Sequence, residues 1–194
     1  MKRICALLVL SAAALSQANL CPNGGFESNT VNTGFLGYYG DVADNWSIFT
    51  DVDPSGTPDM WDNGGVDGNA PGYLGYMNGV TAAEGTNFAS MASDNSGFSE
   101  GIESSRIALT AGTPYLLSLQ LLHDALNPFG RLDPAELTIR LRQGNGASYV
   151  IGQMAPNTLP STWESRSLSF SVNQDDYYTL ILSSETFDGR RPYL

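Results

Sequence analysis

The first half of the chain holds the densest group of side chains that could bind a ligand. Trp61, Tyr73 and Tyr76 stand among glycines and asparagines, where a large ring is difficult to bury. The apolar C–H faces of sugar rings stack on aromatic rings, and nearby carboxylates and amides bind their hydroxyl groups. The neighbours that could do so are Asp59, Asp62 and Asn63. This composition indicates a glycan-binding loop, with the alternative that the rings only fix their own loops to the domain.

The same stretch carries oxygen-bearing side chains at the spacing of a calcium-binding loop. In the segment DVDPSGTPDMWD, which runs from Asp51 to Asp62, oxygens fall at positions 1, 3, 5, 9 and 12, and Gly56 stands at position 6. Against such a site, no helix is expected on either side, Pro58 occupies position 8, and Asp62 replaces the bidentate glutamate. Asp51 and Asp53 are therefore candidate calcium ligands, with an acidic, turn-rich loop as the simpler interpretation.

Motifs for catalysis are weak. The segment GFSEG at 97–101 matches the pattern of a nucleophilic serine, but that motif needs a strand, a sharp turn and a helix, followed by an acid and a histidine. A strand is expected after the segment, and the chain has a single histidine, His123. The adjacent acids Asp175 and Asp176 lie in an expected turn and do not converge as a glycosidase pair must. The sequence therefore predicts a protein that is not an enzyme.

Residues 1–18 have the features of an export signal. Lys2 and Arg3 precede an apolar run of about a dozen residues, and Ser16 and Ala18 place small side chains before a cleavage point. About 20 apolar residues are needed to span a bilayer, so this run is too short. We expect a secreted or cell-surface protein whose single domain comprises residues 19–194, without a transmembrane segment.

The chain is strongly acidic, with a formal net charge of −11. Nucleic-acid binding depends on clustered cationic side chains, so no nucleic-acid partner is expected. The acidity is explained by solubility outside the cell or by carboxylates that bind divalent cations. Cys21 is the one cysteine outside the export signal, and Leu20 before it is too large for lipoprotein processing. We therefore expect Cys21 to pack as a small apolar residue.

Alternating apolar and polar residues predict that an antiparallel β-sandwich or jelly roll holds these loops. Helical periodicity is nearly absent. Turn-forming residues separate the expected strands at 111–114, 127–130, 144–146 and 173–176. We expect one all-β domain whose sheets have an apolar side and a solvent-facing side. The inward rows are Tyr115, Leu117, Leu119 and Leu121; Leu137, Ile139 and Leu141; Leu168, Phe170 and Val172; and Tyr178, Leu180 and Leu182.

Several motifs occur in an order that resembles the galactose-binding-like jelly rolls, a group with many bacterial carbohydrate-binding modules and secreted surface proteins. NLCPNGGFES at 19–28 resembles the opening N-L-V-x-N-G-x-F-E of that family. GTPD at 56–59, EGTNFA at 84–89, LTAGTPY at 109–115 and Trp163 before LSF are similar to its later motifs. The family's final strand, with I-D-D/N-V, has no counterpart, so we expect the chain to lack that strand.

The resemblance implies a site and a function. The glutamate of this opening is commonly a ligand of a structural Ca²⁺ in calcium-bearing members, which makes Glu27 a candidate ligand; the alternative is a surface glutamate at a strand end. By the same analogy, Trp46 and Trp163 belong to the core. The implied function is a non-catalytic carbohydrate-binding or adhesion-type module that binds a polysaccharide or glycan. A structural cell-surface or matrix protein without a small ligand is the alternative.

Overall fold

The computed structural model describes residues 19–28, 43–51, 58–62, 81–91, 99–122, 136–155 and 162–185. Within these ranges the secondary structure consists of β-strands, and every pair of named strands is antiparallel. The predicted all-β class is confirmed. In the same ranges, no helix has the length and hydropathy that crossing a membrane requires.

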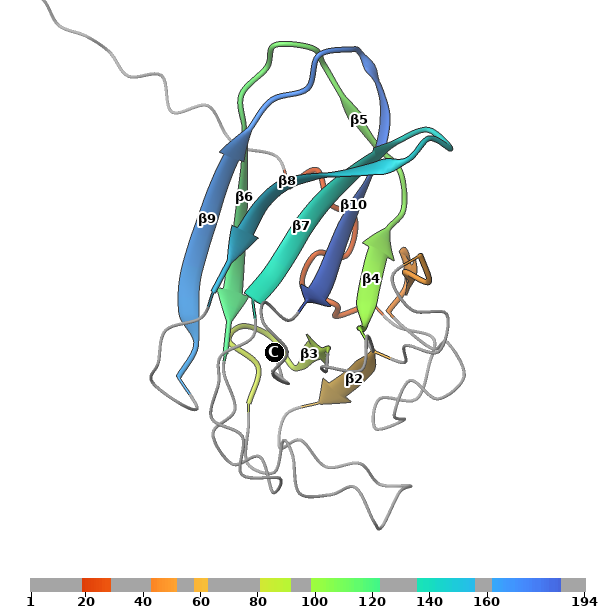
Figure 1. The fold of residues 1–194 in the computed structure, drawn as a ribbon. Helices are drawn as coiled ribbons and strands as arrows, with labels where there is room; N and C mark the ends of the chain where they lie inside the picture. Colours follow the sequence, from red (N-terminus) through yellow and green to blue (C-terminus); the bar gives the residue numbers. More distant parts are fainter. Residues whose placement is uncertain are drawn as a thin grey trace, which may run out of the picture.

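The largest sheet has six strands and is centred on β10 (Figure 1). Its order is β1-β4-β10-β7-β8, and β5 also pairs with β10. The bounds are β1 (Trp46–Ile48), β4 (Gly101–Ser104), β5 (Ile107–Leu109), β7 (Glu136–Gln143), β8 (Ser148–Met154) and β10 (Asp176–Glu185). Because β10 pairs along its length with three other strands, it fixes the register of most of the sheet.

Two shorter pairs of strands complete the β-sandwich. β6 (Tyr115–Leu121) pairs with β9 (Glu164–Phe170), and β2 (Asp59–Asp62) pairs with β3 (Asn87–Ser90). In Figure 1, β6 and β9 stand beside β8 at the left of the large sheet, and β2 and β3 lie at its lower end. Gly152 on β8 permits close packing of the two layers, since a Cβ there would lie 2.6 Å from the Leu168 side chain of β9.

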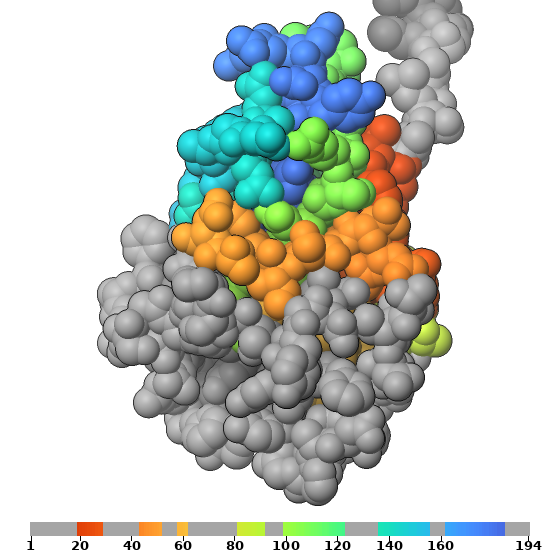
Figure 2. All heavy atoms as spheres, turned by 90° about the vertical axis from the view of Figure 1, so that its right-hand side faces the viewer, coloured from red at the N-terminus to blue at the C-terminus, as the bar shows by residue number. Residues whose placement is uncertain are grey.

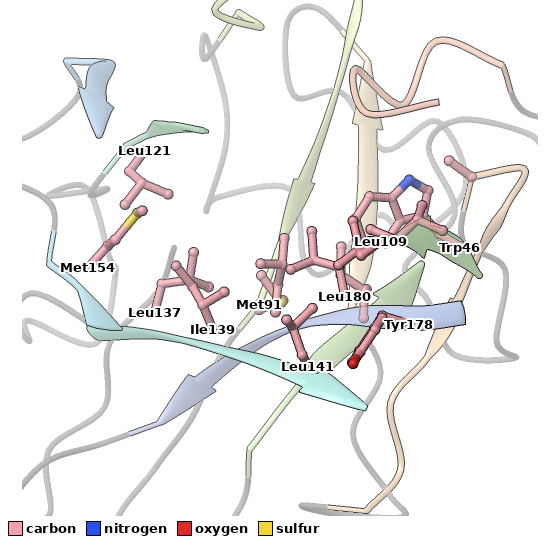
Figure 3. Close-up of a cluster of buried hydrophobic side chains, with 14 of the residues drawn as sticks. Trp46, Met91, Leu109, Leu121, Leu137, Ile139, Leu141, Met154, Tyr178 and Leu180 are labelled. Carbon is pink, nitrogen blue, oxygen red and sulfur yellow. The ribbon is translucent and has the colours of Figure 1, made fainter. Parts of the chain in front are cut away.

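The core lies between these layers, where the predicted inward rows meet. Leu137, Ile139 and Leu141 on β7 are at most 1% exposed, and the row on β10 joins the same cluster. Figure 3 shows these side chains gathered with Trp46 and Met91. The rows on β6 and β9 pack against the cluster from the opposite layer. Burial of each such apolar side chain stabilises the fold by about 1.5–3 kcal/mol.

The expected solvent-facing side of the large sheet is covered instead. Thr138, Ile181 and Ser183 are fully buried, although they alternate with the core row. One part of the cover is the segment after β1, where Phe49 is 2% exposed, its backbone N–H donates to the Gly101 carbonyl at 2.9 Å, and its ring lies against Gly101. Figure 2 shows the segment 43–51, in orange, across this side of the molecule. The large sheet is therefore buried on both faces near β10.

The turns between the later strands follow the predicted residues. Gly112 and Gly144 have φ angles of 69° and 53°, which only glycine adopts without strain. The Gly146 N–H donates to the Gln143 carbonyl at 2.9 Å and closes the β7–β8 turn. The expected turn at 127–130 lies outside the described residues, as do the export signal at 1–18 and residues 186–194. The signal and the missing final strand stay predictions.

Phe49→Ala tests whether the second face of the sheet depends on this ring. The substitution removes a fully buried aromatic side chain and leaves a cavity over Gly101, so we expect a loss of about 3–5 kcal/mol in the free energy of unfolding. Leu116→Ala on β6 is the control, because Leu116 is 50% exposed and should change stability by about 0.5 kcal/mol at most. Urea unfolding measures both, and equal midpoints for the two variants would contradict the packing.

Candidate functional site

The opening motif folds into a hydrogen-bonded turn at residues 21–26. The side chain of Asn23 closes it, since its amide group donates to the carbonyls of Ser28 at 2.6 Å and Asp44 at 2.8 Å and its oxygen accepts from the Ser28 N–H at 2.9 Å. Asn23 and Phe26 both have positive φ, 50° and 59°. A left-handed Phe is uncommon, and here its ring packs on Trp46 with centroids 5.2 Å apart.

Glu27 attaches this turn to the start of β3. One carboxylate oxygen accepts the Thr86 and Asn87 N–H groups at 2.9 and 3.0 Å, and the other accepts the Thr86 hydroxyl at 2.7 Å. Gly85 makes the approach possible, because it has φ of 72° and a Cβ there would lie 2.2 Å from Glu27 Oε1. A residue with a side chain at position 85 would displace the carboxylate. We call this arrangement the Glu27 clamp.

The clamp favours the ionised form of Glu27. Desolvation raises the pKa of the carboxyl, but the hydrogen bonds from the Thr86 hydroxyl and from the Asn87 and Thr86 amides outweigh it, so the pKa lies below its ordinary value. The carboxylate is therefore charged over the physiological range and holds the turn as an anionic acceptor.

A cleft of about 550 Å³ opens beside the clamped turn. The turn and β3 form one side of it, through Gly24, Phe26 and Asn87 among others, and strands β6 and β9 contribute the other. Its polar lining comes from exposed side chains in two register pairs of β6 and β9. These pairs are Ser118 with Ser167 and Gln120 with Ser165. The Gln120 amide already donates to the Ser165 hydroxyl at 2.9 Å.

Trp163 forms the aromatic end of the cleft. It is half-buried, directly precedes β9, and its indole N–H donates to the Thr81 carbonyl at 2.6 Å. The Phe88 ring meets it edge to face, with centroids 5.8 Å apart. Phe88, Trp61 and Leu122 form a second buried cluster against which Trp163 packs. The ring is thereby held in place while part of it remains accessible to a ligand.

The cleft therefore offers the ring of Trp163 beside a row of hydroxyl and amide groups, with Phe26 and Phe88 also in its lining. Such a lining suits a ligand with an apolar face and several hydroxyls. Among the described lining residues, Glu84 is the one carboxylate.

The sequence prediction placed the ligand site elsewhere, on Trp61. That ring is 3% exposed, lies on β2 and donates its indole N–H to the Ser90 hydroxyl at 2.8 Å, so the expectation of a poorly buried ring is wrong. Asp59 begins β2 and is not among the residues that line the cleft, and Asp62 ends the strand. The remaining predicted ligand-binding residues, Asn63, Tyr73 and Tyr76, lie outside the described residues and stay predictions.

Trp163 and the polar side chains of β6 and β9 are the residues that sequence reasoning missed. Trp46 is 8% exposed and belongs to the core as predicted, whereas Trp163 lies at the edge of the cleft. A signal was present in the alternation, because Gln120 and Ser165 stand at outward positions of their strands. The sequence alone did not show that these outward positions face one another in a cleft.

The predicted calcium ligands take other partners. The oxygens of Glu27 face N–H and O–H donors, and the Asp51 carboxylate lies 3.6 Å from the Arg142 guanidinium, which also pairs with Glu103. Asp53 lies outside the described residues. Within those residues, no three His, Cys, Asp or Glu side chains gather as a metal site requires. Calcium binding stays a prediction.

Comparison with known proteins finds solved structures that have a similar fold. No protein-family model and no curated protein matches the chain. A family 61 carbohydrate-binding module solved with β-1,4-galactotriose is similar over 91% of this chain and 94% of its own, at 13% identity and a TM-score of 0.48. A xylan-binding CBM22-1 domain from Paenibacillus barcinonensis is similar over 87% and 85%, at 14% identity and a TM-score of 0.47.

Glu27→Gln tests the clamp through its pH dependence. Because the folded pKa is lowered, the stabilisation is fully present above the ordinary pKa near 4.5 and is lost as the pH falls through the folded value. At pH 7 we expect the variant to lose about 1 kcal/mol, a fall of roughly 2–4 °C in Tm. Between pH 5 and pH 3, about the range of carboxyl titration, its Tm should change less than that of the wild type.

Glu84→Gln is the matched control for the clamp, since it makes the same change in net charge two residues from Thr86. Its Tm should follow the wild-type pH dependence. Identical pH profiles for the wild type and both variants would show that the Glu27 hydrogen bonds do not stabilise the fold.

Chelation tests the calcium prediction separately. A structural ion must raise Tm by mass action, so EDTA should lower the Tm of a calcium-loaded sample if Glu27, Asp51 or Asp53 binds the ion. Differential scanning calorimetry with and without added calcium measures the change. An unchanged Tm would remove the calcium site and leave the hydrogen-bonded clamp as the role of Glu27.

Proposed function

We propose that this protein is a secreted, non-catalytic carbohydrate-binding module whose cleft between β3, β6 and β9 binds a polysaccharide. The observation that carries the proposal is the half-buried Trp163 ring, which lines a cleft of about 550 Å³ together with hydroxyl and amide side chains. A sugar ring would stack on Trp163, and its hydroxyls would exchange hydrogen bonds with Gln120 and the serines of β6 and β9.

The rigidity of the site supports binding. Trp163 is fixed by the hydrogen bond to Thr81 and by Phe88, and the opposite wall is fixed by the Glu27 clamp. A preorganised cleft loses little conformational entropy when a ligand enters, which favours affinity. The exposed Gln120 and Ser165 are already oriented toward each other by their hydrogen bond, so a sugar hydroxyl can replace or join it.

Trp163→Ala should abolish most of the binding. Loss of the stacking surface is expected to weaken affinity about tenfold or more, equivalent to about 1.4 kcal/mol. Affinity electrophoresis against a panel of soluble polysaccharides, followed by titration calorimetry on any that retard the protein, measures the effect. Gln120→Ala, on an exposed position that does not support the core, should weaken binding several-fold without changing Tm.

Tyr177→Ala is the matched control, because Tyr177 is 59% exposed on β10 and does not line the cleft. It should bind as the wild type does. Unchanged binding by a folded Trp163→Ala variant would move the site away from the cleft. A wild-type protein that no polysaccharide retards would contradict the function and favour the alternative, a structural surface protein.

A further inference from the structure

Two charged side chains line the cleft, and they differ in whether a side chain of opposite charge pairs with them. Arg166 and Glu84 both line it. All three guanidinium nitrogens of Arg166 donate hydrogen bonds: to the Glu164 carboxylate at 2.5 Å and to the carbonyls of Ala155 and Ser165, each at 3.2 Å. The Glu164 side chain is 12% exposed, so this pair is largely shielded from water. The charge of Arg166 is therefore already paired with Glu164, and three of its five N–H donors form hydrogen bonds inside the protein.

Glu84 is exposed and forms no ion pair with the described residues. Every other residue that lines the cleft is neutral, so the unpaired charge of the lining is negative. The whole chain adds a field of the same sign, with a formal net charge of −11. Among the described lining residues, a ligand carboxylate would face Glu84, and the one cation it could approach, Arg166, is already paired with Glu164.

We propose that the cleft selects glycans whose sugar residues are uncharged and rejects those that carry carboxylates, an inference that rests on the proposed function of the same site. The selection works by repulsion and desolvation. A uronic acid would have to lose water without gaining a cationic partner, or displace Arg166 from Glu164 and leave a shielded carboxylate uncompensated. Uncharged hydroxyls are not repelled by Glu84 and need no cationic partner. Gln120 and the serines can form hydrogen bonds with them.

The test compares pairs of polysaccharides that differ in charge alone. The probes are β-1,4-galactan, glucomannan and mixed-linkage β-glucan, each beside a sample whose primary hydroxyls have been oxidised to carboxylates. Titration calorimetry at low ionic strength should give affinity for a bound neutral form about tenfold or more above that for its oxidised partner. Added salt should narrow the difference, since the Debye length falls to about 10 Å at 0.1 M.

Glu84→Gln should reduce the difference in affinity between the neutral and oxidised polysaccharides several-fold. It should strengthen binding of the oxidised form and have little effect on binding of the neutral form. Glu136→Gln is the control, because it makes the same change in net charge at a position outside the cleft; it should leave the difference unchanged. Equal or tighter binding of the oxidised form by the wild type, or equal effects of the two substitutions, would overturn the inference while the proposed function stands. Binding of neither form would overturn both.

Discussion

The cleft depends on one carboxylate. Glu27 accepts three hydrogen bonds from Thr86 and Asn87 and so joins the N-terminal turn to a strand that begins about 60 residues later in the chain. Without that attachment the turn and β3 would keep only the weaker hydrogen bond from the Asn87 amide to the Phe26 carbonyl at 3.4 Å, and one wall of the cleft would be held less firmly. The glycine at 85 is part of the same constraint, because only a residue without a side chain leaves room for the carboxylate.

The rest of the domain supplies a rigid frame for this attachment. β10 pairs with β4, β5 and β7, and its residues 178–184 are buried on both faces. A one-residue shift of β10 would turn the row of Tyr178, Leu180 and Leu182 out of the core and replace it with Thr179, Ile181 and Ser183. β6 and β9 pack against this sheet through their inward rows, which leaves their polar outward rows free to line a cleft.

Two tryptophans show how far the sequence could place an aromatic ring. The sequence predicts a ligand site at Trp61 beside carboxylate and amide groups, which stays a prediction, and the structure has a ring beside hydroxyl and amide groups in the cleft. The ring is Trp163, however, and Trp61 lies beneath it in the buried cluster with Phe88. Local composition suggested that a ring among glycines and asparagines would stay exposed, but strand pairing of β2 with β3 brings Trp61 beside Phe88 and buries it. Whether each ring is buried or exposed is thus decided by contacts with segments far away in the chain.

The sequence by itself determined the class of the fold, the inward rows of the later strands and the turns at Gly112 and Gly144, because alternation and positive-φ positions are local properties of the chain. The tertiary structure alone decided that Glu27 meets Thr86, that Phe49 covers the second face of the sheet, and that the outward rows of β6 and β9 line a cleft with Trp163. These are contacts between segments distant in sequence, and no local pattern specifies which of the available partners a side chain will meet.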